Sequence, residues 1–457
     1  MTVRPPNHLA QVFLALAVTY GIYQCGRAFF HPKQGLDFTP EYVASRMLFD
    51  EGDLRFYDYE VVKEYGRKFG LHGPLGETDP VVNYAYPPWL AVAYAPLSRL
   101  PWEAARRIWF IIGLAATCGA AMLLGAAVAP TRQKRREFVL IGLAAACLFF
   151  PVPYGLMTGQ ANDLPLLGIA ASLFLLRSGR PFAAGLVLAP AGLWKIFTGF
   201  PALFLIARRE WRALWGLVAG CVTIVLLSLP FVGPAAWLDW ARYIPRQEGL
   251  PSPGLRNHSI AAAVHYLLQP NEVLVDGRTL AIPPLFDAPG LAGTTTVLLS
   301  ILAVAATALA LLRPARRDEP RYAVQFAATL VLAVLLTPKS WEHYGVFLLP
   351  AFLACVAAEV GSATARPRTL RLAALGTAFA VWGLLYQTKD DYLALATWPR
   401  VAFIPAKAYA SAVLLGLCVM ASAKRVPRAG EGAGEAGAAA SDDGQSPGAG
   451  SDSGGTQ

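Results

Sequence analysis

Long apolar runs separated by short clusters of basic residues dominate this chain of 457 residues. The runs are roughly 15 to 25 residues long, and a helix needs about 20 apolar residues to cross the hydrocarbon core of a bilayer. Hydrophobic residues make up 55% of the chain and charged residues only 15%, whereas soluble domains carry about 25% charged residues. The pattern predicts an all-α integral membrane protein with about a dozen membrane-embedded segments.

The basic clusters indicate which loops face the cytoplasm. The net charge of the chain is +9, and its Lys and Arg residues gather in the short loops between apolar runs. This is the distribution that the positive-inside rule describes for cytoplasmic loops, so it does not indicate a nucleic-acid partner. The longer loops, at 31–101 and 232–290, are then expected outside, with both termini inside.

The apolar runs define the expected spans and domains. Residues 1–426 should form one polytopic domain, and the Gly-, Ala-, Ser- and Asp-rich residues 427–457 a disordered cytoplasmic tail. The loop 31–101 mixes polar and apolar residues, which predicts short helices on the outer membrane surface. Single spans are expected near 9–30, 103–129, 138–154, 162–176, 214–231, 291–312, 323–337, 345–360, 372–386 and 403–422.

The apolar run at 182–207 does not fit a single crossing. It contains Pro190 and Lys195, and it leads to another basic cluster that begins at Arg208. A single crossing would place that cluster, and every later one, outside. We therefore expect two half-length helices that meet near Lys195 and return the chain to the cytoplasmic side. Broken helices of this kind normally line a cavity.

Sequence motifs for metal or cofactor binding are missing. The six cysteines lie in or beside apolar runs, and the six histidines form neither an HxxxH nor an HExxH pattern. There is no glycine-rich phosphate-binding loop and no Asp-x-Asp motif outside the terminal tail. We expect a function that uses neither a metal ion nor a cofactor.

Two charged residues occupy unusual places beside or within apolar runs. Asp37 follows the first span within a few residues and could act as a general base at the mouth of a cavity, although loop aspartates are common. Lys195 lies inside an apolar run, where a charge is costly and usually functional. Its ammonium group could hold a phosphate, or it could simply extend to the membrane interface.

The predicted outer loops also carry amide, imidazole and aromatic groups. Gly159-Gln160-Ala161-Asn162 offers two amides that could bind sugar hydroxyls, or Asn162 could cap a helix. Trp341-Glu342-His343-Tyr344 is either a site with a titratable imidazole or part of an interfacial aromatic belt. Asn257-His258-Ser259 matches a glycosylation sequon and could equally hydrogen-bond a substrate.

These motifs, in this order, resemble glycosyltransferase family 87 of the GT-C superfamily, which contains polyprenol-phosphate-mannose-dependent mannosyltransferases and their relatives. The resemblance covers roughly residues 10–420, with a bulky Trp194 and a long, proline-rich loop at 232–290 as departures. The matching pieces are Asp37-Phe38 with Tyr42, Gly52, Tyr57-Asp58, Tyr86-Pro87-Pro88, Gly159-Gln160 with Asn162, Gly185 to Lys195, Asn257-His258-Ser259, and Ser340-Trp341 with His343.

The resemblance implies a GT-C-type helical bundle in a bacterial inner membrane, with an active site that faces the periplasm. It implies inverting transfer of a hexose, with mannose as the sugar that the family suggests, from a polyprenyl-phosphate donor to a glycolipid or polysaccharide acceptor. It also implies that Asp37 is the catalytic base. The donor phosphate would contact Lys195, His343, Arg106 (or Arg107) and Lys339. The sugar or acceptor would contact Tyr42, Tyr86, Gln160, Asn162, Asn257, His258, Ser259 and Trp341.

Other function classes fit parts of the same pattern. A transporter or lipid flippase would also use broken helices and an intramembrane lysine, although its gates should lie on both sides of the membrane rather than on one. A related GT-C enzyme could use another lipid-linked sugar such as arabinofuranose. An O-antigen ligase-like enzyme would instead transfer a lipid-linked glycan.

Overall fold

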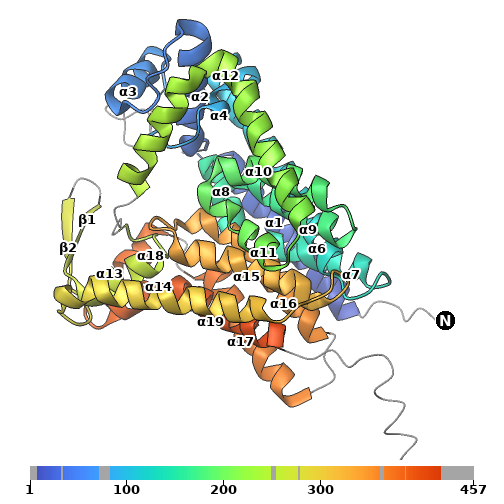
Figure 1. Cartoon of the computed structure of the whole chain (residues 1–457). Coiled ribbons are helices and arrows are strands. Elements are labelled where there is room, and N and C mark those ends of the chain that lie inside the picture. The colour runs from blue at the N-terminus through green and yellow to red at the C-terminus, as the bar shows by residue number, and fades with distance from the viewer. Residues whose placement is uncertain are drawn as a thin grey trace, which may run out of the picture. The chain divides into compact units, whose positions relative to one another are not determined.

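The computed structural model describes residues 8–31, 34–71, 83–248, 254–275, 278–360, 365–385 and 388–423, which are almost entirely helical (Figure 1). Six helices are long and apolar enough to cross a membrane. The expected membrane class is therefore confirmed. These helices are α1 (His8–Phe29), α6 (Trp102–Val128), α12 (Trp211–Glu248), α14 (Pro289–Leu312), η4 with α16 (Glu342–Leu348 and Leu349–Val360), and α19 (Ala406–Ala423).

Several other expected spans are shorter or more polar helices. Helix α9 (Asp163–Arg177) has 15 residues and α15 (Pro320–Leu336) has 17, whereas a straight crossing needs about 20. Helix α17 (Ala365–Leu384) begins inside the basic cluster that contains Arg368 and Arg371. The terminal tail predicted at 427–457 lies outside the described residues.

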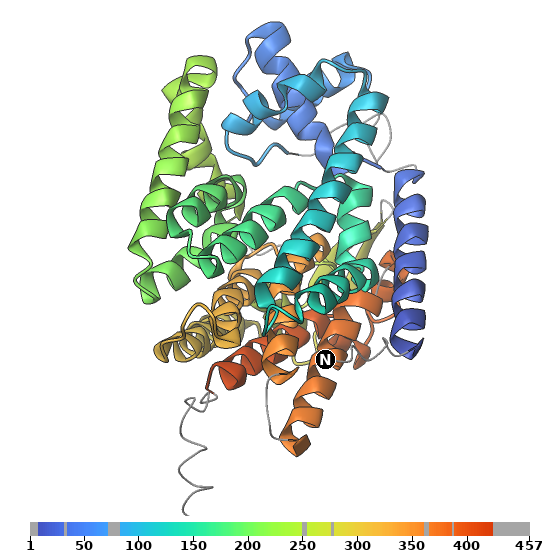
Figure 2. The same cartoon turned by 90° about the vertical axis from the view of Figure 1, so that its right-hand side faces the viewer.

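The span predicted at 138–154 is not one helix. Helix α7 (Arg135–Leu148) and helix α8 (Pro151–Thr158) meet at an angle of 60°. Pro151 begins α8 because proline lacks the backbone N–H that a continuing helix needs and sterically opposes the preceding turn. The bend turns α8 toward α1, and Figure 2 shows α1 at one side of the bundle, where it packs against α7 and α8.

The broken pair predicted at 182–207 is confirmed. Helix α10 (Pro181–Trp194) ends at Lys195, whose backbone is extended, and the chain resumes as η3 (Ile196–Gly199) and α11 (Pro201–Ala207). Arg208 then donates to the carbonyl of Arg313, and Glu210 forms an ion pair with Arg317. The basic loops after α11 and α14 therefore lie at the same end of the bundle, as the half-helix interpretation requires.

The loop 31–101 folds into short helices, as expected. They are η1 (Leu36–Phe38), α2 (Thr39–Arg46), η2 (Met47–Glu51), α3 (Tyr59–Lys68), α4 (Trp89–Ala93) and α5 (Ala95–Ser98). Aromatic and aliphatic side chains from these helices and from α6 form a separate hydrophobic core that includes Phe38, Tyr84, Tyr94 and Trp109. Helix α4 also packs against α12 at this end of the bundle (Figure 1).

The loop predicted at 232–290 contains more regular structure than expected. Helix α12 continues to Glu248 past a kink at Gly233, whose φ of 66° and ψ of 171° are not helical. Helix α13 (Ile260–Leu268) and an antiparallel hairpin of β1 (Asn271–Val275) and β2 (Arg278–Ile282) follow. Beyond α17 lie α18 (Lys389–Leu393) and η5 (Arg400–Phe403).

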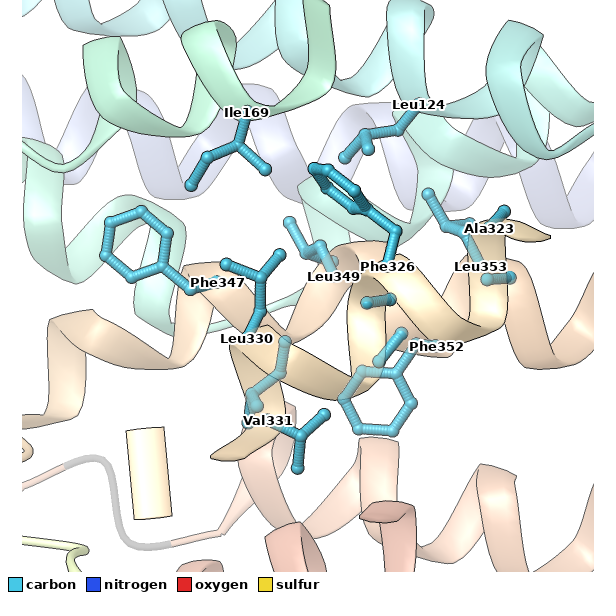
Figure 3. Close-up of a cluster of buried hydrophobic side chains, with 14 of the residues drawn as sticks. Leu124, Ile169, Ala323, Phe326, Leu330, Val331, Phe347, Leu349, Phe352 and Leu353 are labelled. Carbon is cyan, nitrogen blue, oxygen red and sulfur yellow. The ribbon is translucent and has the colours of Figure 1, made fainter. Parts of the chain in front are cut away.

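A large apolar core fixes the C-terminal helices against α6 and α9. Figure 3 shows Phe326 and Leu330 of α15 and Leu349 of α16 facing Leu124 of α6 and Ile169 of α9. Between helices in a bilayer, contacts of this kind stabilise through van der Waals packing rather than through removal of apolar surface from water. Because α16 continues directly from η4, this core also fixes the segment that carries His343.

The arrangement predicts a labelling pattern in intact cells. Glu272 in the β hairpin and Asp318 in the loop after α14 are both exposed. In a background without the native cysteines, a cysteine at 272 should react with a membrane-impermeant maleimide, and a cysteine at 318 should react only after lysis. The parent protein without cysteines is the control, and the reverse labelling pattern would contradict the topology.

Candidate active site

A cavity of 1370 Å³ opens where α10 breaks, at the far end of α10 from its basic loop. Its lining comes from η1, α8, η3, η4, the loop before α13, and the ends of α1 and α12. Many of the predicted site residues meet here although they are far apart in the sequence. Those in the lining are Asp37, Tyr86, Gln160, Lys195, Lys339, Trp341 and His343.

Asp37 is half-buried at the cavity wall, in the single turn of η1. Burial raises the pKa of its carboxyl, while hydrogen bonds from Gln160 and Thr158 and the charge of Lys195 act in the opposite direction. The turn that carries it is held by the bond from the Gly35 N–H to the Met157 carbonyl, at 3.0 Å. Asp37 is therefore a fixed carboxylate with a perturbed proton affinity.

A close contact of two glycines brings Asp37 next to Gln160. Gly35 and Gly159 both have positive φ, at 83° and 78°. A Cβ atom on Gly159 would lie 2.7 Å from the Gly35 Cα, so no larger residue fits there without a shift of the backbone. This contact joins the first outer loop to the turn after α8.

Gln160 connects the predicted base to the predicted phosphate-binding lysine. Its Oε1 accepts a hydrogen bond from Lys195 Nζ at 3.0 Å and a longer one from the Tyr86 hydroxyl at 3.4 Å. Its side chain also lies near the Asp37 carboxylate, whose pKa it lowers. One amide thus lies between the acid and the cation in the lining of the same cavity.

The Lys195 side chain points into the cavity rather than out to a membrane surface. Only 7% of the residue is exposed, and its ammonium group lies 4.5 Å from the centre of the Tyr344 ring and 5.7 Å from that of Tyr86. Cation–π contacts of this kind contribute about 0.5–2 kcal/mol. The extended backbone at Lys195, where α10 stops, directs the side chain inward.

Arg256 is a cavity residue that the sequence interpretation missed. Its guanidinium lies 4.8 Å from the centre of the Tyr154 ring, and that ring stacks on His343 with centroids 6.3 Å apart. Arg256 therefore adds a second cation on the His343 side of the cavity. An available signal was its position, since an arginine in a predicted outer loop departs from the positive-inside pattern.

Asn257, His258 and Ser259 lie outside the described lining and hold two segments together. The Asn257 amide donates to the Pro338 carbonyl at 2.7 Å and accepts from the Ser340 N–H at 2.9 Å. The Ser259 hydroxyl donates to the same Pro338 carbonyl, and the His258 N–H donates to the Ser340 carbonyl. These contacts position Arg256 beside the 337–343 segment; direct contact with a sugar stays a prediction.

Three other predicted residues also lie behind the described cavity wall. Arg106 bonds to Gln34 and to Glu103, beside Gly35. The Tyr42 hydroxyl donates to the Leu100 carbonyl at 2.8 Å. The Asn162 amide donates to the His343 carbonyl at 2.9 Å. Each of them supports a segment of the wall, so their expected contact with substrate is untested.

The described residues contain no cluster of three or more His, Cys, Asp or Glu side chains that could hold a metal ion. The cavity lining offers carboxylates, the Gln160 amide, hydroxyl groups and cations. Arg256, Lys195 and His343 can stabilise an anion, and Asp37 can accept a proton.

Comparisons with known proteins found two similar mannosyltransferases. A polyprenol-phosphate-mannose-dependent alpha-(1-2)-phosphatidylinositol mannoside mannosyltransferase of Mycobacterium tuberculosis is 25% identical over 394 residues, 84% of this chain and 82% of the relative. A polyprenol-phosphate-mannose-dependent alpha-(1-2)-phosphatidylinositol pentamannoside mannosyltransferase of the same species is 25% identical over 276 residues, 59% of this chain and 57% of the relative. No solved structure gives a significant match.

The family model of glycosyltransferase family 87 matches residues 84–338, which is more than half of the chain. The matched residues include Tyr86, Gln160, Lys195 and the Asn257 segment. The family resemblance expected from the motifs is thus confirmed, and the matched stretch contains the broken helix at Lys195. The chain is a multi-pass membrane protein that belongs to glycosyltransferase family 87.

Proposed function

We propose that this protein transfers a hexose, with mannose as the first candidate, from a polyprenyl-phosphate donor to a glycolipid or polysaccharide acceptor at the outer face of a bacterial inner membrane. The observation that carries the proposal is the Asp37–Gln160–Lys195 arrangement, in which one amide separates a base from a cation. The relatives' use of polyprenol-phosphate-mannose, as their names state, makes mannose the first sugar to test.

The proposed reaction is a single displacement. The acceptor hydroxyl oxygen attacks the anomeric carbon of the donor as Asp37 takes the hydroxyl proton. The bond between that carbon and the phosphate oxygen breaks, and the lipid phosphate leaves with one more negative charge. Because attack occurs on the side opposite the leaving phosphate, the anomeric configuration is inverted.

The leaving phosphate requires fixed positive charge more than it requires an acid. We assign this role to Lys195, which is largely buried, together with Arg256 on the neighbouring wall, where the buried imidazole of His343 can add a hydrogen bond. Fixed charges in a cavity that excludes water stabilise a developing anion without reorganisation. Lys339 also lies in the lining and can contribute from the 337–343 segment.

An apolar side of the cavity supports a lipid-linked donor. Ile196, Phe197 and Phe200 line it beside Leu336 of α15, and 56% of Ile196 is exposed on the surface that would face lipid. A polyprenyl chain in the bilayer could therefore reach Lys195 between η3 and α15 without crossing a polar barrier. This apolar lining favours a lipid-linked donor over a sugar nucleotide, which would need an aqueous entrance and usually a metal ion.

The direct test is transfer by the purified protein with radiolabelled polyprenyl-phosphate-mannose, with polyprenyl-phosphate-arabinofuranose and polyprenyl-phosphate-glucose as parallel donors. Glycolipid and polysaccharide acceptors are compared with each. A labelled acceptor whose new linkage is inverted relative to the donor supports the proposal. Transport of labelled donor across a vesicle membrane without a transferred product would instead favour a flippase.

Lys195→Met should reduce turnover by about 100-fold, because the neutral side chain has a similar length but cannot stabilise the leaving phosphate. The affinity for the acceptor should change little. The measurement is initial rate against donor and acceptor concentration for detergent-purified protein. Lys134, which is part of the basic loop before α7, provides the control variant Lys134→Met with normal turnover. Full activity of Lys195→Met at normal donor affinity would contradict the phosphate role.

A further inference from the structure

Stacked aromatic rings extend from Trp194 in the cavity lining to residues behind the cavity wall. The Phe38 ring lies between those of Trp102 and Trp109, with centroids 5.7 Å and 5.4 Å away and both planes tilted by 15°. Trp109 in turn stacks on Trp194, with centroids 6.5 Å apart and planes tilted by 28°. We call Trp102, Phe38, Trp109 and Trp194 the aromatic column.

The aromatic column touches the chain next to each polar group of the site. Phe38 directly follows Asp37, and Trp194 directly precedes Lys195. The Trp109 indole N–H donates a buried hydrogen bond of 2.8 Å to the carbonyl of Gly159, which precedes Gln160. The base, the bridging amide and the cation therefore come from different elements, and each is attached to a residue that the column holds.

We propose that Trp109 is a positioning residue that sets the relative placement of Asp37, Gln160 and Lys195. This inference rests on the proposed function, since it assigns the column to the same reaction. Trp109 is the member that makes both kinds of contact: its ring stacks on Phe38 and Trp194, and its N–H fixes the Gly159 turn.

A packing role alone does not account for these contacts. Apolar packing of an aromatic ring requires no directional hydrogen bond. The indole N–H of Trp109, which is its only hydrogen-bond donor, is nevertheless bonded to the turn that carries Gln160. Gly159 also lies directly against the Gly35 backbone, so the turn has no space to move in that direction. Loss of the indole hydrogen bond would leave the buried Gly159 carbonyl without this partner and allow the turn to shift. A shift of about 1 Å at reacting groups can lower a reaction rate by about 100-fold.

Trp109→Phe tests the inference because it keeps an aromatic ring in the column and removes the N–H. We expect kcat to fall by about 10-fold, within the range that small misplacements produce, with the KM values for donor and acceptor changed by less than about twofold. The matched control is Trp237→Phe, which removes another indole bond, that to the Ser228 hydroxyl at 3.1 Å, outside the cavity lining. It should leave kcat unchanged.

A double-mutant cycle separates positioning from packing. If Trp109 acts through Gln160, the Trp109→Phe change should cost kcat little in a protein that already carries Gln160→Ala. Additive losses, or a normal kcat for Trp109→Phe accompanied only by a lower melting temperature, would overturn the inference.

A second readout does not depend on turnover. A cysteine introduced as Gln160→Cys should react with a small water-soluble maleimide about threefold faster when Trp109→Phe is also present, because the turn then opens locally more often. Equal labelling rates with and without Trp109→Phe would contradict the proposal that Trp109 fixes the turn that carries Gln160. A wild-type protein that transfers no sugar would overturn the proposed function instead, and the labelling rates would still decide whether Trp109 fixes the turn.

Discussion

Asp37→Asn should lower sugar transfer by about 100-fold or more while the protein still folds and inserts, because asparagine keeps the shape of the side chain and cannot accept the acceptor proton. Asp37 lies in the described cavity lining near Gln160 and Lys195, whereas the carboxylate of Glu342, which also belongs to the lining, is ion-paired with Lys407. The measurement is kcat of the detergent-purified variant with saturating donor and acceptor, compared with that of the wild type.

The pH dependence of transfer should report the same group. Burial raises the pKa of Asp37 above its ordinary value, so its proton-accepting form is lost earlier as the pH falls than it would be for an exposed aspartate. Activity should decline on the acid side as the pH drops through this raised pKa. The residual activity of Asp37→Asn should lack that acid limb.

Two neighbouring aspartates provide controls. Asp58 caps α3 by accepting from the Glu60 and Val61 N–H groups, and Asp53 pairs with Arg55. Asparagine also caps helices well, so Asp58→Asn should retain near-normal transfer. A normal rate for Asp37→Asn combined with a large loss for Asp58→Asn would move the base to Asp58 and refute the present assignment.

Glu41 is the other carboxyl near the base, and its surroundings argue against the same role. It is completely buried, and its carboxylate oxygens have no hydrogen-bond partner among the described residues. Burial raises its pKa well above the ordinary value, which favours the neutral form. The Lys195 charge acts on both carboxyls, but Asp37 also has the side-chain hydrogen-bond donors Gln160 and Thr158 to stabilise its ionised form.

Much of the fold could be predicted because the requirements for membrane insertion determine the length of the apolar runs and the distribution of basic residues in the sequence. Apolar length and basic clusters identified the long helices, and the same charge pattern required the chain to turn back near Lys195. The bend between α7 and α8 was missed although Pro151 was visible, because proline is also tolerated within membrane helices. Hydrophobic periodicity alone also did not reveal that α12 continues past its predicted end, or that α13 and the β hairpin follow it.

The individual cavity residues could be predicted, and their contacts could not. Asp37, Gln160 and Lys195 each occupy an unusual place in the sequence, but only tertiary structure brings the Gly35 and Gly159 turns together. The sequence did not reveal the contacts of Asn257, His258 and Ser259. A polar triplet in an outer loop has the same sequence pattern whether it binds a sugar or the protein's own carbonyls, and here it bonds to the protein.

The sequence interpretation overlooked Lys407. It lies in an apolar run, which is the same signal that identified Lys195.

Lys407 belongs to a buried ion pair that ties the last helix to the cavity wall. Lys407 and Glu342 are both 0% exposed and form a direct ion pair between α19 and the first residue of η4. The Tyr392 hydroxyl donates to Glu342 at 3.0 Å, and His258 Nε2 lies 3.6 Å from the same carboxylate. The residue that follows Glu342 is His343, so the pair fixes the wall that we assign to the donor phosphate.

Lys407→Met should destabilise the protein by about 3–5 kcal/mol, because it leaves the Glu342 carboxylate buried without its counter-charge. The double variant Glu342→Gln with Lys407→Met removes both charges and should recover most of that stability. The measurement is the melting temperature and the monodisperse fraction of the detergent-purified variants. The control is Arg316→Met, which breaks the exposed pair with Asp318, whose contribution should stay below about 1 kcal/mol.

The same variants should also separate the pair's effect on stability from its effect on catalysis. Without the ion pair, η4 keeps its apolar anchoring through α16 and the contacts of Asn257 with the 337–340 segment, so the double variant should fold. His343 would nevertheless be less firmly held, and the KM for the donor should rise several-fold while that for the acceptor stays unchanged. If the single Lys407→Met variant is no less stable than Arg316→Met, the carboxylate is not charged when it is buried, and the wall is held by packing alone.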